Sequence, residues 1–303
     1  MLQSPDLYPT RTGGPERILP RREPVVWEGL APPQPWRLSP DQVASYAERG
    51  YLVFPGLLED LVEPLWREIE RLARTLGTRP ERIAEPDSDE LRTLFDPDRF
   101  SDLIDAVSRD PRILHPVRQL LGSEVHLMQS RVNVKPALVG KAFPWHSDFE
   151  TWHCEDGLPA MRTLTAWIML TENHAFNGPL YVLPGSHRLF VSCGGRTRPD
   201  NQKTSLRRQE LGVPSPTVMG ELLERFPLDA VQGPPGTLVF HECNLLHGSP
   251  DNLSGDPRTL LMFVYNSVEN RPGAPYSGLP PRPPFLCRRQ DPALEPLVAP
   301  VRP

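Results

Sequence analysis

Two histidines and one aspartate have the residue types and the spacing of metal ligands. His146 and Asp148 are separated by one residue, and side chains two positions apart in an extended segment point to the same side. An H-x-D pair is common by chance, so a surface pair is the simpler interpretation when it stands alone. His247, at the end of a later β-like run, adds the third ligand of a facial triad. Such a triad leaves coordination positions open and favours non-haem Fe(II) used in O2 chemistry.

An arginine after the last of these ligands indicates that an organic acid binds beside the metal. Arg258 begins another β-like run, and a guanidinium can form two parallel hydrogen bonds with a carboxylate. An H-x-D pair, a distant histidine and a following arginine together form the arrangement of 2-oxoglutarate-dependent oxygenases. Each feature is weak alone, and their combination predicts Fe(II) and 2-oxoglutarate.

The segment MQSRVNVK alternates polar and apolar residues with the period of a β-strand. A half-exposed strand with its polar side in water would show the same pattern. If the strand instead lines a pocket, four donors without a carboxylate would suit an anionic ligand. The polar face carries Gln129, Arg131, Asn133 and Lys135.

Residues 143–157, FPWHSDFETWHCEDG, contain more metal-capable side chains than one ion needs. In an extended chain Glu150 would share the side of His146, where a fourth ligand would close the open face. We therefore expect Glu150 and His153 to support the structure. The EDG sequence at the end of the segment predicts a turn.

This segment, with the two residues that follow it, resembles the signature of ectoine hydroxylases, a branch of the phytanoyl-CoA dioxygenase superfamily. The start of the chain, with DLYPTR and PVVW, also resembles the family's N-terminus. The resemblance extends over nearly the whole chain. Further similar segments are NGPLYVLPGSHRLFVSC, SLRRQELGVP, CNLLHGSP and FVYNSVEN.

The resemblance implies a mainly β protein with surrounding helices and a double-stranded β-helix (jelly-roll, cupin-like) core. It implies a dioxygenase that needs Fe(II) and uses 2-oxoglutarate and O2 as co-substrates. The family hydroxylates ectoine, a compatible solute, to 5-hydroxyectoine, with succinate and CO2 as co-products. A homodimer that serves the osmotic stress response is implied as well.

Carried over motif by motif, the resemblance implies three groups of site residues. The iron ligands would be His146, Asp148 and His247. The residues expected at 2-oxoglutarate are Lys135, Arg258, Asn133, Phe143 and Thr165. The residues expected at ectoine are Gln129, Trp152, Arg131, Asn266 and Arg282. Because the iron carries the chemistry, no separate acid or base is expected.

Three residues depart from the pattern of the family. Pro144 stands where an aromatic residue is usual, Trp167 where a small residue is expected, and His241 where a second phenylalanine is expected. These departures leave open the same chemistry on another small zwitterion, such as a cyclic amino acid. A non-catalytic jelly-roll binding protein is an alternative of another class, and the complete triad with its nearby cations argues against it.

Local signals indicate the elements that would position these residues. Ser39 can cap a helix that begins with Pro40 and ends at Gly50. A short buried strand in YLVFPGLL is expected next, followed by a long amphipathic helix over 59–76 and two short helices over 101–122. Beyond them, β-like runs separated by Gly, Pro, Asn and Asp indicate a sandwich or barrel.

We expect one oxygenase domain over residues 1–303, with two additions to its core. Residues 1–38 are rich in proline, which suits an extended arm packed on the domain. Residues 187–232 would form a lid-like insertion with two weak helices, because long connections in compact β domains are often functional.

The composition argues for a soluble enzyme of the cytoplasm. The net charge is −5 and there is no basic stripe, which argues against nucleic acid as a partner. No run approaches the roughly 20 apolar residues of a membrane span, and the N-terminus lacks the apolar centre of a secretory signal. The four cysteines are widely spaced, as free thiols in a reducing compartment would be.

Overall fold

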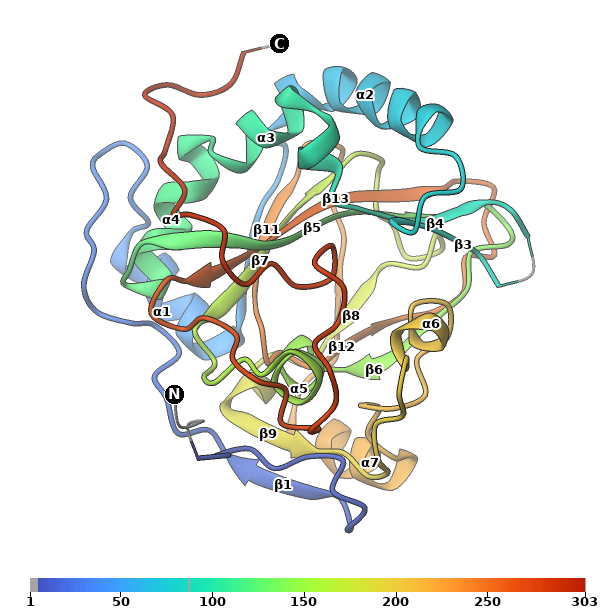
Figure 1. Ribbon diagram of the computed structural model, residues 1–303. Helices are drawn as coiled ribbons and strands as arrows, with labels where there is room; N and C mark the ends of the chain where they lie inside the picture. The colour runs from blue at the N-terminus through green and yellow to red at the C-terminus, as the bar shows by residue number, and fades with distance from the viewer. Residues whose placement is uncertain (1–4, 87, 303) are drawn as a thin grey trace.

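The computed structural model describes residues 5–86 and 88–302, and its centre is a pair of facing β-sheets (Figure 1). The larger sheet has the antiparallel strand order β2-β11-β7-β13-β5-β4-β3, and the smaller sheet has the order β10-β8-β12-β6. The larger sheet consists of β2 (Tyr51–Phe54), β3 (Arg82–Ala84), β4 (Leu91–Phe95), β5 (Val125–Lys135), β7 (Thr163–Met169), β11 (Leu238–Glu242) and β13 (Arg258–Ser267). The smaller sheet consists of β6 (Phe143–His146), β8 (Leu180–Val182), β10 (Asp229–Val231) and β12 (His247–Ser249).

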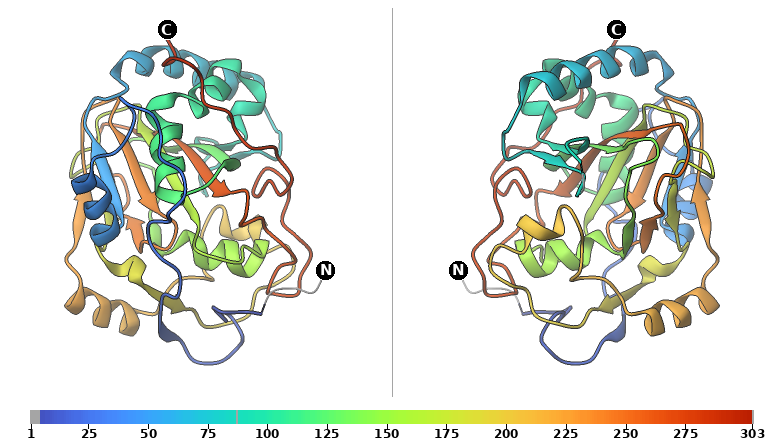
Figure 2. Two further views of the ribbon diagram at one scale, coloured as in Figure 1. Left: turned by 90° about the vertical axis from the view of Figure 1, so that its left-hand side faces the viewer. Right: turned by 90° about the vertical axis from the view of Figure 1, so that its right-hand side faces the viewer.

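Helices cover the outer face of the larger sheet (Figures 1 and 2). Ser39 caps the first of them through a capping box with Gln42, and Gly50 ends it in the left-handed conformation, which confirms the predicted helix. The predicted helix over 59–76 and the two short helices after it are also present. The helices are α1 (Pro40–Arg49), α2 (Val62–Thr75) after the 3-10 turn η1 (Glu59–Leu61), and α3 (Asp102–Ser108) and α4 (Pro111–Leu121) after η2 (Pro97–Phe100).

The main hydrophobic core lies between these helices and the larger sheet. On β7, Ala166 and Ile168 point into this core, whereas Trp167 and Met169 belong to a second apolar cluster. Successive side chains of a strand point to opposite faces of the sheet, so one strand serves both clusters. The second face is directed at the smaller sheet, and it carries the candidate site.

The strand β5 has the alternation that its sequence predicts. It pairs with β13, so that Lys135 lies opposite Arg258 and Asn133 opposite Leu260. Its polar residues Gln129, Arg131 and Asn133 line a cavity between the sheets. The interpretation in which this polar side faces water is therefore wrong.

The N-terminal arm contacts the smaller-sheet side of the molecule. It forms β1 (Arg17–Pro20), which pairs antiparallel with β9 (Leu189–Ser192), although neither strand was expected. Tyr8 is fully buried, and Arg11 is buried in an ion pair with Glu150, whose carboxylate lies at 2.5 Å.

Of the two helices expected in the insertion, the one over SPTVMGELLERF is present as α7 (Pro216–Arg225), which Ser215 caps. The other was expected in SLRRQELG, residues 205–212, but the only helical turn there, α6 (Gln202–Ser205), ends at Ser205, so that prediction is wrong. The segment after β8 also contains elements that the sequence did not predict, namely the 3-10 turn η4 (Ser186–Arg188) and the strands β9 and β10.

The chain after His146 does not stay extended, so the condition under which Glu150 would share the side of His146 is not met. The hydroxyl of Ser147 caps α5 (Asp148–Thr151), and a π-helical turn, η3 (Trp152–Asp156), continues it. Gly157 ends the turn with φ 73°. A local cap at one end and a left-handed glycine at the other therefore make the expected strand and turn into a short helical segment.

Candidate active site

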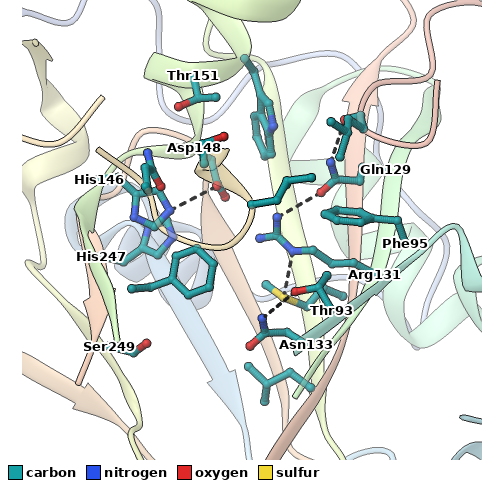
Figure 3. Close-up of a pocket in the computed structure, with 18 of the residues that line it drawn as sticks. Thr93, Phe95, Gln129, Arg131, Asn133, His146, Asp148, Thr151, His247 and Ser249 are labelled. Atoms are coloured by element: carbon teal, nitrogen blue, oxygen red, sulfur yellow. Dashed lines mark hydrogen bonds and ion pairs between the residues drawn. The ribbon is translucent and has the colours of Figure 1, made fainter. Parts of the chain in front are cut away.

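The three predicted metal ligands meet at a buried cavity between the two sheets (Figure 3). His146 ends β6 and His247 begins β12, and the two are direct partners in the pairing of these strands. Asp148 follows at the start of α5. One possible ligand atom from each of the three lies within 4.8 Å of the others, and all three side chains are buried.

Each ligand histidine presents one ring nitrogen to the cavity because the other is hydrogen-bonded to the backbone. The Nδ1 of His146 lies 2.8 Å from the carbonyl of Pro144, and the Nδ1 of His247 lies 2.9 Å from the carbonyl of Leu245. A carbonyl only accepts, so each Nδ1 carries the proton and each Nε2 keeps a free lone pair. This is the tautomer that a metal ligand needs.

The charge states at these ligands also suit a metal. Burial lowers the pKa of His146 and, further, that of His247, so both imidazoles are neutral. Burial alone would raise the pKa of Asp148, but a hydrogen bond from His241 and the charge of Arg131 hold it well below its usual range. Two neutral imidazoles and one carboxylate fit Fe(II) in a facial triad.

Two basic side chains at one end of the cavity region have no carboxylate partner in the described part of the chain. Arg258 donates to the carbonyl of Gly178 and to Oδ1 of Asn133, both at 2.7 Å, and Lys135 donates to the hydroxyl of Ser249 at 2.8 Å. Burial lowers the pKa of Arg258 to about 10, and burial together with the charge of Arg258 lowers that of Lys135 to about 6. A bound acid would supply the missing negative charge, so this end fits 2-oxoglutarate.

Arg131 is a third basic side chain of this kind, and it lies across the cavity from the triad (Figure 3). Its Nη1 donates to Oε1 of Gln129 at 3.1 Å, and its Nε lies 3.3 Å from the sulfur of Met262. Gln129 in turn donates to the carbonyl of Leu286 at 2.7 Å. These contacts are neutral, so the guanidinium charge is left for a ligand.

Three further predicted residues line the cavity, namely Trp152, Phe143 and Arg282. The guanidinium of Arg92 lies 4.3 Å from the centroid of the Phe143 ring. Arg282 donates to both carboxylate oxygens of Asp156, so its charge is already balanced within the protein.

Lys135, Thr165 and Asn266 do not line the cavity. Lys135 lies behind Ser249, which does line it. Thr165 is fully buried in β7, and Asn266 lies near the far end of β13, where it accepts from the hydroxyl of Thr163 at 2.6 Å. Thr165 lies directly opposite the cavity-lining His241 but is not itself part of the lining, so direct ligand contacts for Thr165 and Asn266 stay predictions.

The departures from the family pattern have different places in the structure. His241 lines the cavity, whereas Trp167 lies behind it and is fully buried. Pro144 is half-buried in β6, and only its carbonyl takes part in the site, by accepting from His146. Since any residue supplies a carbonyl, Pro144 leaves the triad geometry unaffected.

Several cavity residues were missed by sequence reasoning. Thr93 and Phe95 come from β4, a strand that was not expected. Ser249 had a usable signal, because it follows His247 by two residues in a strand and so points to the same side. The insertion contributes Asn201, Ser205, Leu206, Gln209 and Leu211.

The sequence also matches a known family over most of its length. Residues 46–260 match the family described as phytanoyl-CoA dioxygenase (PhyH). The chain belongs to the phytanoyl-CoA dioxygenase family. Other members of this family that resemble it carry the name ectoine dioxygenase. The one from Bordetella bronchiseptica is 45% identical over 289 residues, covering 94% of this chain and 93% of its own length. The one from Halomonas elongata is 44% identical over 296 residues, covering 96% of this chain and 88% of its own length.

A solved structure of a phytanoyl-CoA dioxygenase relative agrees with the fold. The crystal structure of EctD from S. alaskensis with 2-oxoglutarate and 5-hydroxyectoine matches with a TM-score of 0.85 at 37% identity, covering 96% of this chain and 97% of that one. EctD from S. alaskensis with bound Fe matches with a TM-score of 0.84 at 36% identity, covering 97% and 98%. With two facing antiparallel sheets and surrounding helices, the predicted double-stranded β-helix core is confirmed.

Proposed function

We propose that this protein is an Fe(II)- and 2-oxoglutarate-dependent dioxygenase that hydroxylates ectoine. The reaction consumes ectoine, 2-oxoglutarate and O2 and yields 5-hydroxyectoine, succinate and CO2. The observation that carries the proposal is a triad of His146, Asp148 and His247 in a cavity lined by Arg131 and Arg258, which form no ion pair with a carboxylate of the described chain. Similarity to the ectoine dioxygenases supports the choice of substrate.

The triad would hold Fe(II) through Nε2 of His146, Nε2 of His247 and a carboxylate oxygen of Asp148. When bound, the iron supplies the oxidising chemistry, with O2 as the oxidant and 2-oxoglutarate as the co-reductant. The protein holds the three ligands on one side of the metal and leaves the other side open.

Arg258 is the principal candidate for the far carboxylate of 2-oxoglutarate. Contacts with Asn133 and Gly178, both at 2.7 Å, hold its guanidinium in place. A guanidinium that is already fixed loses little conformational entropy when it binds a carboxylate with two hydrogen bonds. Ser249 offers a second hydrogen-bonding group on the cavity lining, and its hydroxyl accepts from Nζ of Lys135 behind it.

Arg131, Gln129 and Trp152 are the candidates for ectoine. Ectoine is a small ring with a carboxylate and a charge-delocalised amidinium. The guanidinium of Arg131 suits the carboxylate, and the ring of Trp152 suits the cation. Gln129 accepts a hydrogen bond from Arg131 and itself lines the cavity, where it can contact the ligand. Arg282 has the weaker role of anchoring Asp156 beside them.

Incubation with Fe(II), 2-oxoglutarate and ectoine tests the proposed function. Mass spectrometry should show the gain of one oxygen by ectoine, with one succinate released per product. Conversion of a cyclic amino acid instead of ectoine would establish the alternative substrate class. No succinate release with any small zwitterion would favour the non-catalytic binding protein.

Removal of a ligand histidine should abolish both Fe(II) binding and turnover. We expect this result for His146→Ala and for His247→Ala, because each removes one of the three ligands. His174→Ala is the matched control, since this half-buried histidine does not line the cavity. Succinate release at the wild-type rate from either ligand variant would contradict the triad.

We further propose that the enzyme is a cytoplasmic homodimer that serves the osmotic stress response. Resemblance to the family supports the dimer, and the role of ectoine as a compatible solute supports the physiological setting. Light scattering on the purified protein measures the oligomeric state, and a monomer at micromolar concentration would contradict the dimer.

A further inference from the structure

Trp167 and His241 form a hydrogen-bonded chain that ends on a metal ligand. The Nε1 of Trp167 lies 3.1 Å from Nδ1 of His241, and Nε2 of His241 lies 3.4 Å from Oδ2 of Asp148. The two side chains are 0% and 1% exposed, so water does not compete for their polar groups. Trp167 and His241, which both depart from the family pattern, are therefore connected by a hydrogen bond.

The register of two strands brings these residues together. His241 on β11 lies opposite Thr165 on β7, so Trp167, two residues after Thr165, is its diagonal neighbour on the same face. This face is directed at the smaller sheet. There the Trp167 ring packs in an apolar cluster that includes Val182 and Leu245.

The chemistry of the indole determines the direction of each hydrogen bond. Indole N–H only donates, so His241 must accept from Trp167 through Nδ1. In a neutral imidazole the proton is then on Nε2, and Nε2 donates to the carboxylate of Asp148. Trp167 thus determines the tautomer in which His241 contacts the metal ligand.

We propose that Trp167 and His241 are positioning residues for Asp148. Their chain holds Oδ2 and leaves Oδ1, which lies 3.8 Å from Nε2 of His146, as the oxygen for the metal. Binding through one oxygen preserves the open positions that the co-substrate and O2 require. This inference rests on the metal site of the proposed function and adds to it two residues outside the triad.

His241 acts on the metal through Asp148 and is not itself a ligand. The group of mutually close ligand atoms consists of His146, Asp148 and His247. The ring centroid of His241 lies 5.1 Å from that of His247, and its described polar contacts are with Trp167 and Asp148. A fourth protein ligand would also occupy one of the open positions.

Titration with Co(II), a spectroscopically visible stand-in for Fe(II), tests the proposal without ectoine or turnover. His241→Phe should weaken Co(II) binding roughly 10- to 100-fold, the usual effect of losing an outer partner of a metal ligand. Trp167→Phe, which removes only the N–H donor, should weaken it less. The double variant should lose no more than His241→Phe alone, because the two bonds act in series. His241→Gln should restore most of the affinity, because its amide can donate to the same oxygen.

Three results would overturn the proposal. One is unchanged affinity in His241→Phe, and another is additive losses in the double variant, which would indicate independent packing effects. The third is loss of a nitrogen ligand from the Co(II) spectrum of His241→Phe, which would make His241 a direct ligand. Failure of the proposed function is distinct from all three, because it would be seen in the wild-type protein as no metal binding or no hydroxylation of ectoine.

Discussion

At the scale of single residues, the site depends on cations whose charge the protein does not balance. Arg131, Lys135 and Arg258 contact neutral partners within the described chain. Burying a charge without a counter-charge destabilises the folded protein. A protein that keeps two buried guanidinium charges and a lysine with a lowered pKa in one region therefore has an electrostatic preference for anionic ligands.

The destabilisation caused by burying Lys135 can be measured, because it changes with pH. Its pKa is about 6 in the folded protein, against 10.5 for an ordinary lysine. Between these values the unfolded chain binds a proton that the folded protein does not, so the free energy of unfolding rises with pH. We expect Lys135→Met to raise the free energy of unfolding at pH 7, and this gain to shrink towards pH 10.

Urea unfolding at pH 7, 8.5 and 10 measures this effect. Lys203→Met is the control, because the side chain of Lys203 is 72% exposed and should give no such trend. A stability difference for Lys135→Met that is the same at all three pH values would show that lost packing, and not the charge of Lys135, causes it. Added 2-oxoglutarate should stabilise the wild type more than Lys135→Met.

At the scale of elements, the N-terminal arm holds the helical segment α5–η3 against the cavity. Arg11 of the arm forms ion pairs with Glu150 on α5 and Glu155 on η3. Although burial opposes the charge, these carboxylates hold the pKa of Arg11 above its usual range. Because Trp152 lies between the two glutamates in the chain, the arm also supports a cavity wall.

Arg11→Ala should therefore destabilise the protein strongly. The change leaves Glu150 buried without a counter-charge, which typically costs about 3–5 kcal/mol, and leaves Glu155 with only Arg282, whose Nη1 lies 3.9 Å away. Adding Glu150→Gln should recover part of the loss, because it removes one unpaired charge. Urea unfolding measures both effects. Arg17→Ala, an exposed change on the same arm, should stay within about 0.5 kcal/mol of wild type, and an equal loss in this control would refute the specific role of Arg11.

At the scale of the whole molecule, segments far apart in the sequence line one cavity. The two sheets and the segment α5–η3 contribute to it, the chain after β13 adds Arg282 and Leu286, and the insertion adds residues of α6 and of the chain on either side of it. Asn201 of this insertion donates to Glu155 at 2.8 Å, so it contacts the same carboxylate as the N-terminal arm.

Across the described ranges no helix is long and apolar enough to span a membrane, and the four cysteines are buried free thiols.

We expect the insertion to close over bound ligands. Fe(II), 2-oxoglutarate and ectoine, added together without O2, should slow hydrogen exchange in residues 198–211, where the side chains line the cavity. The helix α7 belongs to the same insertion but contributes no lining residue, so its exchange should change less. Equal slowing in both segments, or none in either, would contradict a lid.

The sequence alone determined the features that depend on neighbours in the chain. The caps Ser39 and Gly50 bound α1, because each acts on backbone groups within a turn of itself. The alternation of β5 placed Gln129, Arg131 and Asn133 on one face because the period of a strand is two. The motif around His146 and Asp148 likewise identified the family.

Only the tertiary structure decided which distant groups meet. Arg11 and Glu150 are 139 positions apart, and Trp167 and His241 are 74 apart. Each pairing depends on how the arm docks or how β7 and β11 are registered, and no local signal encodes either. Sequence reasoning could see Trp167 and His241 as two separate departures. Their position on one face of a sheet, beside Asp148, is what joins them, because hydrogen bonds depend on distance in space and not along the chain.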